Sequence, residues 1–295
     1  MRTLLAAFFG VVAMVLILAS ILVVWLNRTL LDTNTYVNTV APLANQVDVQ
    51  TFLANKATDQ LLANAPTQDL AKQLLPASEV TGRNDVQLLS ALRPVLNANF
   101  LKLLSSSDFA ALWKSTNRNA HEQLLSQLNS GGSEISLDLS PAVNSLLVQI
   151  KTTQLAPISD KIKLDPASAK VDLKGSSVDK VYHYYRLFKQ FSLVLVAATL
   201  LAILLCAGIS VQHGKTLRRI VISTGVLSLL LAFALETPTF IAPSLTDAAS
   251  RATAAIAEVL LHNLQVAMVI LATLCFLIAI VSKLVSRRRT VTGAA

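Results

Sequence analysis

Four long runs of apolar residues alternate with polar segments along this chain. The runs are Leu4–Leu26, Phe191–Val211, Ile220–Leu235 and Leu264–Ser282. A helix needs about 20 apolar residues to cross the hydrocarbon core of a bilayer, so the first, second and fourth runs are long enough. The third run spans only if Arg219 and Glu236, which flank it, reach the two interfaces. The pattern therefore predicts four transmembrane helices.

The polar segment before the second run continues the helical period of the run itself. Apolar and aromatic residues recur there at spacings of three and four, at Val178, Val181, Tyr182, Tyr185 and Phe188. Neither Gly nor Pro occurs between Ser177 and Gly208, so we predict one continuous helix that extends beyond the membrane. By the same argument, the fourth span begins as an amphipathic helix after Ser244.

Between the first two runs, apolar stripes of helical period are separated by capping and breaking residues. Asp48 is placed to cap a helix that follows it, and Asn84 to cap another. Between these helices, Ala77–Arg83 has the composition of a loop. A further helix is predicted over Phe109–Leu128, and Gly131 is placed to end it. Most of this segment should therefore be helical.

The distribution of charge gives the spans an orientation. Hydrophobic residues make up 53% of the chain, charged residues 14%, and the formal net charge is +8. Eight basic residues lie at the ends of the runs that share one side if the spans alternate: Arg2, Lys215, Arg218, Arg219, Lys283, Arg287, Arg288 and Arg289. The other basic residues equal the 17 acidic ones in number. The excess charge is thus a positive-inside signal rather than a nucleic-acid surface, which places both termini in the cytoplasm.

We therefore expect an all-α membrane protein in the cell membrane, with four transmembrane helices. A mainly helical extracytoplasmic domain is inserted between spans 1 and 2, and it includes a small β element of two strands, Ile135–Leu139 and Ala169–Leu173. The expected parts are residues 1–26 (span 1), 27–188 (domain), 189–211 (span 2), 217–238 (span 3), 239–263 (outer loop with an amphipathic helix), 264–285 (span 4) and 286–295 (cytoplasmic basic tail). Both cysteines, Cys206 and Cys275, lie inside apolar runs, so the domain should lack a disulfide.

One polar cluster within the domain is the candidate for chemistry: Trp113, Asn117, Arg118, His121 and Glu122. Trp113, Asn117 and His121 share one helix face, and Arg118 and Glu122 are an i,i+4 pair. A metal site would need a second His or a carboxylate one turn away, and a catalytic His would need an identifiable nucleophile. We interpret the cluster as a buried helix face whose Asn and His bond to neighbouring backbone. The alternative is an enzyme that uses Asn117, Arg118, His121 and Glu122.

Other functions find less support in the sequence. No Asp, Glu, Lys, Arg or His falls inside the four runs, although ion-coupled transporters need such groups at membrane depth. The segment Gly208–Thr216 reads GISVQHGKT, but five residues separate its glycines where a phosphate-binding loop has four. We therefore predict neither a metal nor any other cofactor.

Three stretches of the chain resemble a family of bacterial integral membrane proteins that is common in actinobacteria. They are Tyr36–Ala44, Trp113–Leu125 with its Asn-Arg-Asn-Ala-His core, and Ser136–Leu139. The resemblance continues through Tyr184–Phe188 into the second span and covers much of residues 20–210. It implies a plasma-membrane location and this domain layout, and it carries no catalytic residue over to this chain.

These observations favour a non-enzymatic membrane protein whose extracytoplasmic domain binds a protein, a lipid or a wall component. An envelope enzyme that uses the His121 cluster is the alternative, and a transporter or channel component ranks third. The expected partners are the lipid bilayer and an envelope component, without nucleic acid. Small residues along the apolar runs would also suit contacts between copies of the chain in a homo-oligomer.

Overall fold

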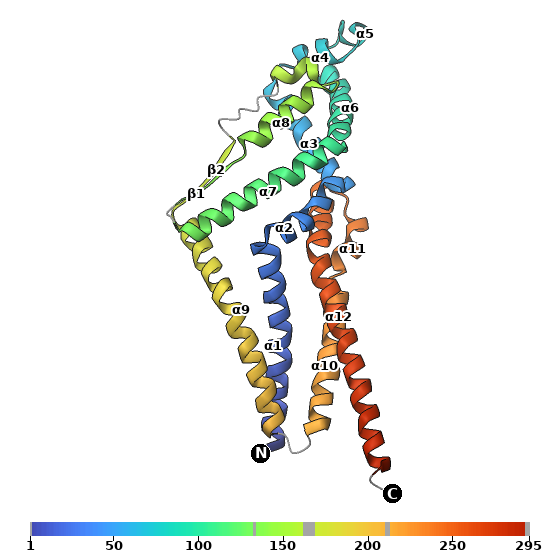
Figure 1. The fold of residues 1–295 in the computed structure, drawn as a ribbon. Helices are drawn as coiled ribbons and strands as arrows, with labels where there is room; N and C mark the ends of the chain where they lie inside the picture. Colours follow the sequence, from blue (N-terminus) through green and yellow to red (C-terminus); the bar gives the residue numbers. More distant parts are fainter. Residues whose placement is uncertain (1, 132–133, 162–168, 210–212, 293–295) are drawn as a thin grey trace. The chain divides into compact units, whose positions relative to one another are not determined.

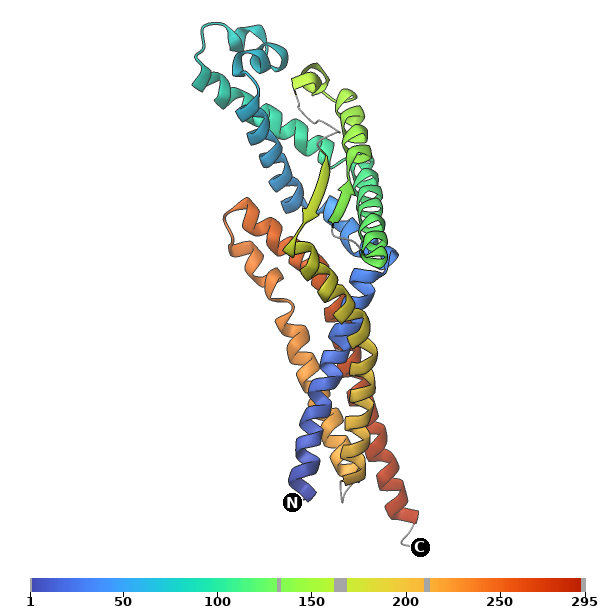
Figure 2. The ribbon, with the colours of Figure 1, turned by 90° about the vertical axis from the view of Figure 1, so that its left-hand side faces the viewer.

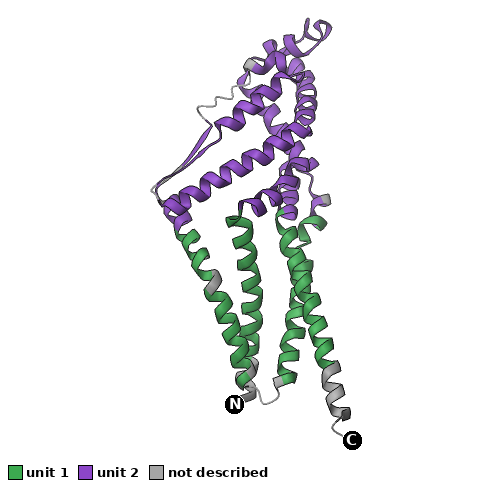
Figure 3. Ribbon diagram, viewed as in Figure 1, with its two compact units in different colours: residues 1–32, 183–240, 260–295 green, residues 33–182, 241–259 purple. Residues whose placement is uncertain are grey.

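The fold is described from a computed structural model that covers residues 2–131, 134–161, 169–209 and 213–292. These residues form a predominantly helical structure with one small sheet (Figure 1). The chain divides into two compact units (Figure 3). Unit 1 comprises residues 1–32, 183–240 and 260–295, and unit 2 comprises residues 33–182 and 241–259.

Unit 1 is built from four long helices, α1 (Arg2–Leu31), α9 (Ser176–Ile209), α10 (His213–Ala234) and α12 (Ala248–Thr292). Figure 2 shows them as long helical ribbons. Each contributes to a segment long and apolar enough to cross a membrane: Phe8–Leu31, Val178–Cys206, Thr216–Ile241 and Ala248–Lys283. The third segment runs on into the short helix α11 (Thr237–Ile241). The prediction of four helices that could span a membrane is confirmed.

Small and polar side chains mark the contacts between the helices of unit 1. The Ser20 hydroxyl of α1 lies 2.8 Å from the Thr199 hydroxyl of α9. On α10, a Cβ added to Gly225 would lie 3.0 Å from Cβ of Cys275 on α12, so α10 and α12 approach closely at this point. Such contacts are typical of helices in lipid, where small residues and hydroxyl bonds replace hydrophobic burial as the cause of association.

Unit 2 contains most of the remaining elements. In chain order they are α2 (Thr33–Val40), η1 (Ala41–Asn45), α3 (Val47–Asn64), α4 (Thr67–Leu74), α5 (Ala77–Val80), α6 (Asp85–Leu104), α7 (Ser107–Ser130), β1 (Glu134–Asp138), α8 (Ser140–Lys151), η2 (Ala156–Lys161) and β2 (Lys170–Lys174). The short helix η4 (Ala242–Ser244) and the first turns of α9 and α12 also belong to this unit.

The main core of unit 2 lies where α3, α4 and α6 pack together. On α6, Leu88, Leu92 and Leu96 are fully buried, and their spacing of four residues forms a single apolar stripe. Ile150 and Ile158, which follow the sheet-forming segment β1, complete the same core. Unit 2 therefore has a hydrophobic core of its own.

The ends of several helices follow the predicted capping signals. Asn84 caps α6 through a capping box, in which the Gln87 backbone N–H donates to Asn84 Oδ1 at 3.0 Å and the Gln87 side chain accepts from Asn84 N–H at 3.1 Å. Gly131 ends α7 with φ of 71°, a conformation that favours glycine. Both predictions are confirmed.

Two local predictions are wrong. Asp48 does not cap α3, because the helix already begins at Val47 and the cap position is Gln46. The Asp48 carboxylate lies in the first turn and pairs instead with Nε of Arg251, 3.1 Å away on the first turns of α12. The predicted loop Ala77–Arg83 contains the one-turn helix α5, because Pro76 has the φ of −59° that suits a helix start.

The two predicted strands pair, as expected. β1 and β2 are antiparallel, with Ser136 opposite Asp172 and Asp138 opposite Lys170. In an antiparallel ladder, residues alternate between those that bond to the partner strand and those that direct their N–H and C=O groups away from it. The backbone groups of Ser136 and Asp138 point away from β2, because both residues bond to side chains of α7. One edge of this small sheet is thus covered by a helix.

Candidate functional site

Helix α7 carries the predicted polar cluster. It begins where the Ser106 hydroxyl accepts the backbone N–H of Phe109 at 3.1 Å, and it ends at Gly131. Its sequence is polar on more than one side, so the burial of each face depends on what packs there. One face lies against α2 and η1, and another faces β1 and α8.

The α2-facing side of α7 holds His121, which is only 6% exposed. Its Nδ1 lies 3.0 Å from the Thr33 hydroxyl, and its ring stacks on Tyr36 with centroids 4.2 Å apart and planes 14° from parallel. Thr33 and Tyr36 both belong to α2. The imidazole is therefore a packing element between two helices rather than a group that lines an open cleft.

Asn117 and Trp113 extend the same contact. The Tyr36 hydroxyl donates to Asn117 Oδ1 at 3.3 Å, and Asn117 Nδ2 donates to the carbonyl of Trp113 at 2.9 Å. The Trp113 indole N–H donates to the carbonyl of Val40 at 3.0 Å, and the ring packs against the main core with partial exposure. Burial of its ring raises the pKa of Tyr36. Asn117 bonds to backbone as expected, whereas His121 lies within hydrogen-bond distance of the Thr33 hydroxyl rather than of a backbone group in the contact described above.

Arg118 and Glu122 lie at the rim of this contact. Nη1 of Arg118 donates to Asn34 Oδ1 at 2.9 Å and lies 3.7 Å from the Glu122 carboxylate. The two side chains are 37% and 55% exposed, so water screens the ion pair. The five predicted residues thus come together along α7, and their interactions serve the α2–α7 contact.

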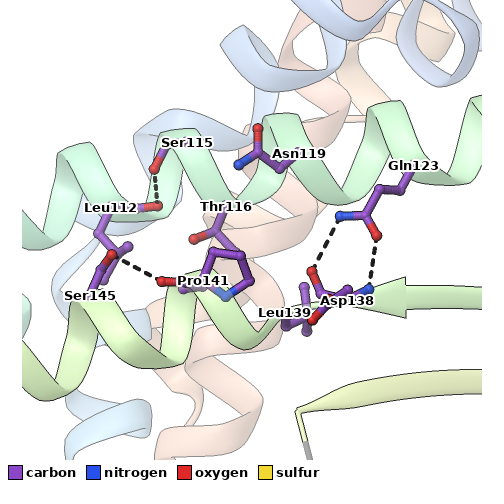
Figure 4. Close-up of a pocket in the computed structure, with 10 residues that line it drawn as sticks. Leu112, Ser115, Thr116, Asn119, Gln123, Asp138, Leu139, Pro141 and Ser145 are labelled. Atoms are coloured by element: carbon purple, nitrogen blue, oxygen red, sulfur yellow. Dashed lines mark hydrogen bonds between the residues drawn. The ribbon is translucent and has the colours of Figure 1, made fainter. Parts of the chain in front are cut away.

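A pocket of about 110 Å³ lies on the other side of α7, against β1 and the start of α8 (Figure 4). It is lined by Leu112, Ser115, Thr116, Asn119, Gln123, Asp138, Leu139, Pro141, Ala142 and Ser145. The sequence contained a signal for it, because polar residues recur on α7 at spacings of three and four from Ser115 to Gln123. That stripe could not be distinguished from a solvated helix face.

Two glutamines hold the wall of this pocket in place. Gln123 donates to the carbonyl of Asp138 at 3.2 Å and accepts its N–H at 2.8 Å (Figure 4). One turn later, Gln127 forms the same pair of bonds with Ser136, at 2.6 and 2.7 Å. A side-chain amide has one donor and one acceptor side, as a peptide group does. The two glutamines therefore bind β1 as a neighbouring strand would.

The Asp138 side chain lies at the junction of β1 and α8. Its Oδ1 accepts the backbone N–H of Ser140 at 2.9 Å. Hydrogen bonds from the Ser140 side chain and backbone lower the pKa of Asp138, and the nearby charge of Lys170 lowers it further. Asp138 is therefore ionised at neutral pH, and its charge faces that of Lys170 across the two-stranded sheet.

Metal ligands do not gather anywhere in the described parts of the chain, where no group of three His, Cys, Asp or Glu side chains could hold an ion. The expectation of no cofactor is not tested by this finding and stays a prediction. No protein-family model matches the sequence, and no curated protein or solved structure is significantly similar to it.

Proposed function

We propose that this chain is a multi-pass cell-membrane protein that presents unit 2 outside the cytoplasm as a non-enzymatic binding domain. Its ligand would be an envelope component rather than a nucleic acid. Four helices long and apolar enough to span a bilayer support the membrane location. The eight basic residues at the ends of the apolar runs support cytoplasmic termini and an external unit 2.

The observation that carries the binding assignment is the contrast between the two faces of α7. On the α2 side, His121 is buried and engaged with Thr33 and Tyr36. On the opposite side, Thr116 and Asn119 line an open pocket, and their side chains form no hydrogen bond with any other described residue (Figure 4). A polar side chain can bind a ligand only if it is accessible, and of these two faces only the second meets this condition.

The enzyme alternative would need the imidazole of His121 to reach a substrate. The Thr33 hydroxyl at 3.0 Å has the spacing of a nucleophile and its base. However, the stacked Tyr36 ring and the 6% exposure of His121 leave no room for a substrate beside that hydroxyl–imidazole pair. The hypothesis of a transporter is weakened because all four apolar runs lack ionisable residues.

The orientation can be tested with single cysteines in a variant whose two natural cysteines are replaced by Ala. Asn144→Cys on α8 should react with a membrane-impermeant maleimide in intact cells, because unit 2 would face outward. Gly214→Cys, between the second and third spans, should react only after the cells are permeabilised. Both residues are exposed in the structure. The reverse pattern would refute the proposed orientation.

Binding can be tested with a photo-reactive amino acid introduced into the full chain in cells. At Asn119, in the pocket, irradiation should yield a discrete adduct that mass spectrometry can assign to a protein, lipid or glycan. Gln73 on α4 is a matched control, because it is also exposed but lies outside the pocket. Absence of an adduct at Asn119, or equal labelling at both positions, would contradict a specific binding site on this face.

A further inference from the structure

We infer that the pocket between α7, β1 and α8 binds one neutral sugar unit. This inference deepens the proposed binding function and rests on it.

The hydroxyl groups of the pocket are mostly available as acceptors. The Ser115 hydroxyl donates to the carbonyl of Leu112, and the Ser145 hydroxyl donates to that of Pro141, each at 3.0 Å (Figure 4). Their hydrogens are thus used within their own helices, while their oxygen lone pairs remain free to accept. Both side chains are exposed toward solvent. A ligand that fits them must donate hydrogen bonds.

Thr116 and Asn119 add groups that can both donate and accept. Both residues line the pocket, and neither side chain forms a hydrogen bond with any other described residue. The Asn119 amide offers two N–H donors and a carbonyl oxygen, and the Thr116 hydroxyl offers one donor and two lone pairs. A ligand with several groups that each donate and accept would satisfy this mixture, and sugar hydroxyls have that property.

The charge of the pocket excludes ionic ligands. No Lys or Arg side chain is among its lining residues, so an anion such as phosphate would meet only the carboxylate of Asp138. An ammonium ligand would need that carboxylate as its counter-ion. However, Asp138 already accepts hydrogen bonds from Ser140 and faces Lys170 across the sheet. The remaining choice is an uncharged polar ligand.

The small volume and the apolar lining residues of the pocket favour a small ring as its ligand. Its volume of about 110 Å³ is well below the roughly 300–1,000 Å³ of pockets that enclose larger ligands. Leu112, Leu139, Pro141 and Ala142 contribute apolar surface against which the C–H groups of a sugar ring can pack. The pocket therefore accommodates one unit, with the rest of any glycan or glycolipid outside.

The test uses the full chain in phosphatidylcholine nanodiscs, which avoid sugar-bearing detergents. Saturation-transfer NMR with glucose and N-acetylglucosamine as probes should show transfer to the sugar protons. Thr116→Val and Asn119→Ala should each weaken binding by about threefold to tenfold, as expected for the loss of one net hydrogen bond. Asn144→Ala, an exposed α8 residue outside the lining set, should leave binding unchanged.

Further measurements identify the source of the sugar. Stronger competition by a soluble tetrasaccharide than by the monosaccharide would support a glycan, and competition by glucosyl diacylglycerol in the nanodisc would support a lipid headgroup. The inference is overturned if neither sugar binds, if the pocket variants bind as the wild type does, or if phosphate or trimethylammonium binds there instead. Both faces of a nanodisc are open, so these outcomes are independent of the orientation experiment.

Discussion

The two glutamines that bind β1 give the sharpest quantitative prediction. Gln123→Ala and Gln127→Ala each remove two hydrogen bonds between α7 and the backbone of β1, at Asp138 and at Ser136 respectively. Alanine keeps the helix intact, because it has the highest helix propensity. The perturbation is therefore confined to the edge of the strand and to the wall of the pocket.

The expected magnitude follows from these bonds. Each hydrogen bond contributes about 0.5–1.5 kcal/mol net, so two contribute about 1–3 kcal/mol. Ser136 is exposed, so its freed N–H and C=O groups can bond to water, and the loss should lie toward the lower end, at about 1–2 kcal/mol. Such a change increases the population of the opened strand by about 5- to 30-fold.

Amide hydrogen exchange of the full chain in nanodiscs measures this opening directly. In Gln127→Ala, the amide of Ser136 should exchange about 5- to 30-fold faster, and in Gln123→Ala the amide of Asp138 should do so. The amides of Ile135 and Leu137, which point toward β2, should change less. Gln73→Ala on α4 is the control and should leave β1 unchanged. Wild-type exchange at Ser136 in Gln127→Ala would refute the role assigned to these glutamines.

Three further predictions concern other parts of the structure. Gly225→Leu should lower the thermal stability of the purified protein, because its side chain would overlap α12, whereas Gly208→Leu, with open space around it, should be tolerated; equal effects would contradict the α10–α12 contact. Trp113→Ala should destabilise unit 2 by about 2–3 kcal/mol, less than a fully buried Trp, and a wild-type unfolding midpoint would show that its packing and its bond to Val40 are dispensable. The pKa of Asp247 is lowered, chiefly by the Ser250 backbone N–H that it accepts at the start of α12. Its stabilisation is therefore present above the unfolded pKa of about 4 and lost as pH falls through the lower folded value, so hydrogen exchange at the start of α12 should accelerate on acidification in the wild type and less in Asp247→Asn.

Features that depend on neighbours in the chain could be predicted from the sequence. The apolar runs predicted the helices that could span a membrane, because a helix that crosses a bilayer needs about 20 consecutive apolar residues. Asn84 and Gly131 predicted helix ends, because capping is a contact over three or four residues. The alternation at Ile135–Leu139 predicted β1 for the same local reason.

Local signals also failed where two of them competed. Asp48 had the residue type of a helix cap, yet α3 begins before it, at Val47. The Asp48 carboxylate pairs with Arg251, about two hundred positions later in the chain. A cap and a distant ion pair use the same carboxylate, and only the folded arrangement decides between them.

The candidate site shows the limit of the sequence most clearly. Helical period alone placed Trp113, Asn117 and His121 on one face of α7. The same period aligns Ser115, Asn119 and Gln123 on another face, but that stripe by itself predicted no site. Nothing in the period states which face meets a partner. The tertiary structure decided it by bringing α2 against the first face and leaving the second open beside β1 and α8. Period fixes the direction of side chains, whereas burial depends on residues far away in the chain, and burial determines which polar groups remain free to bind.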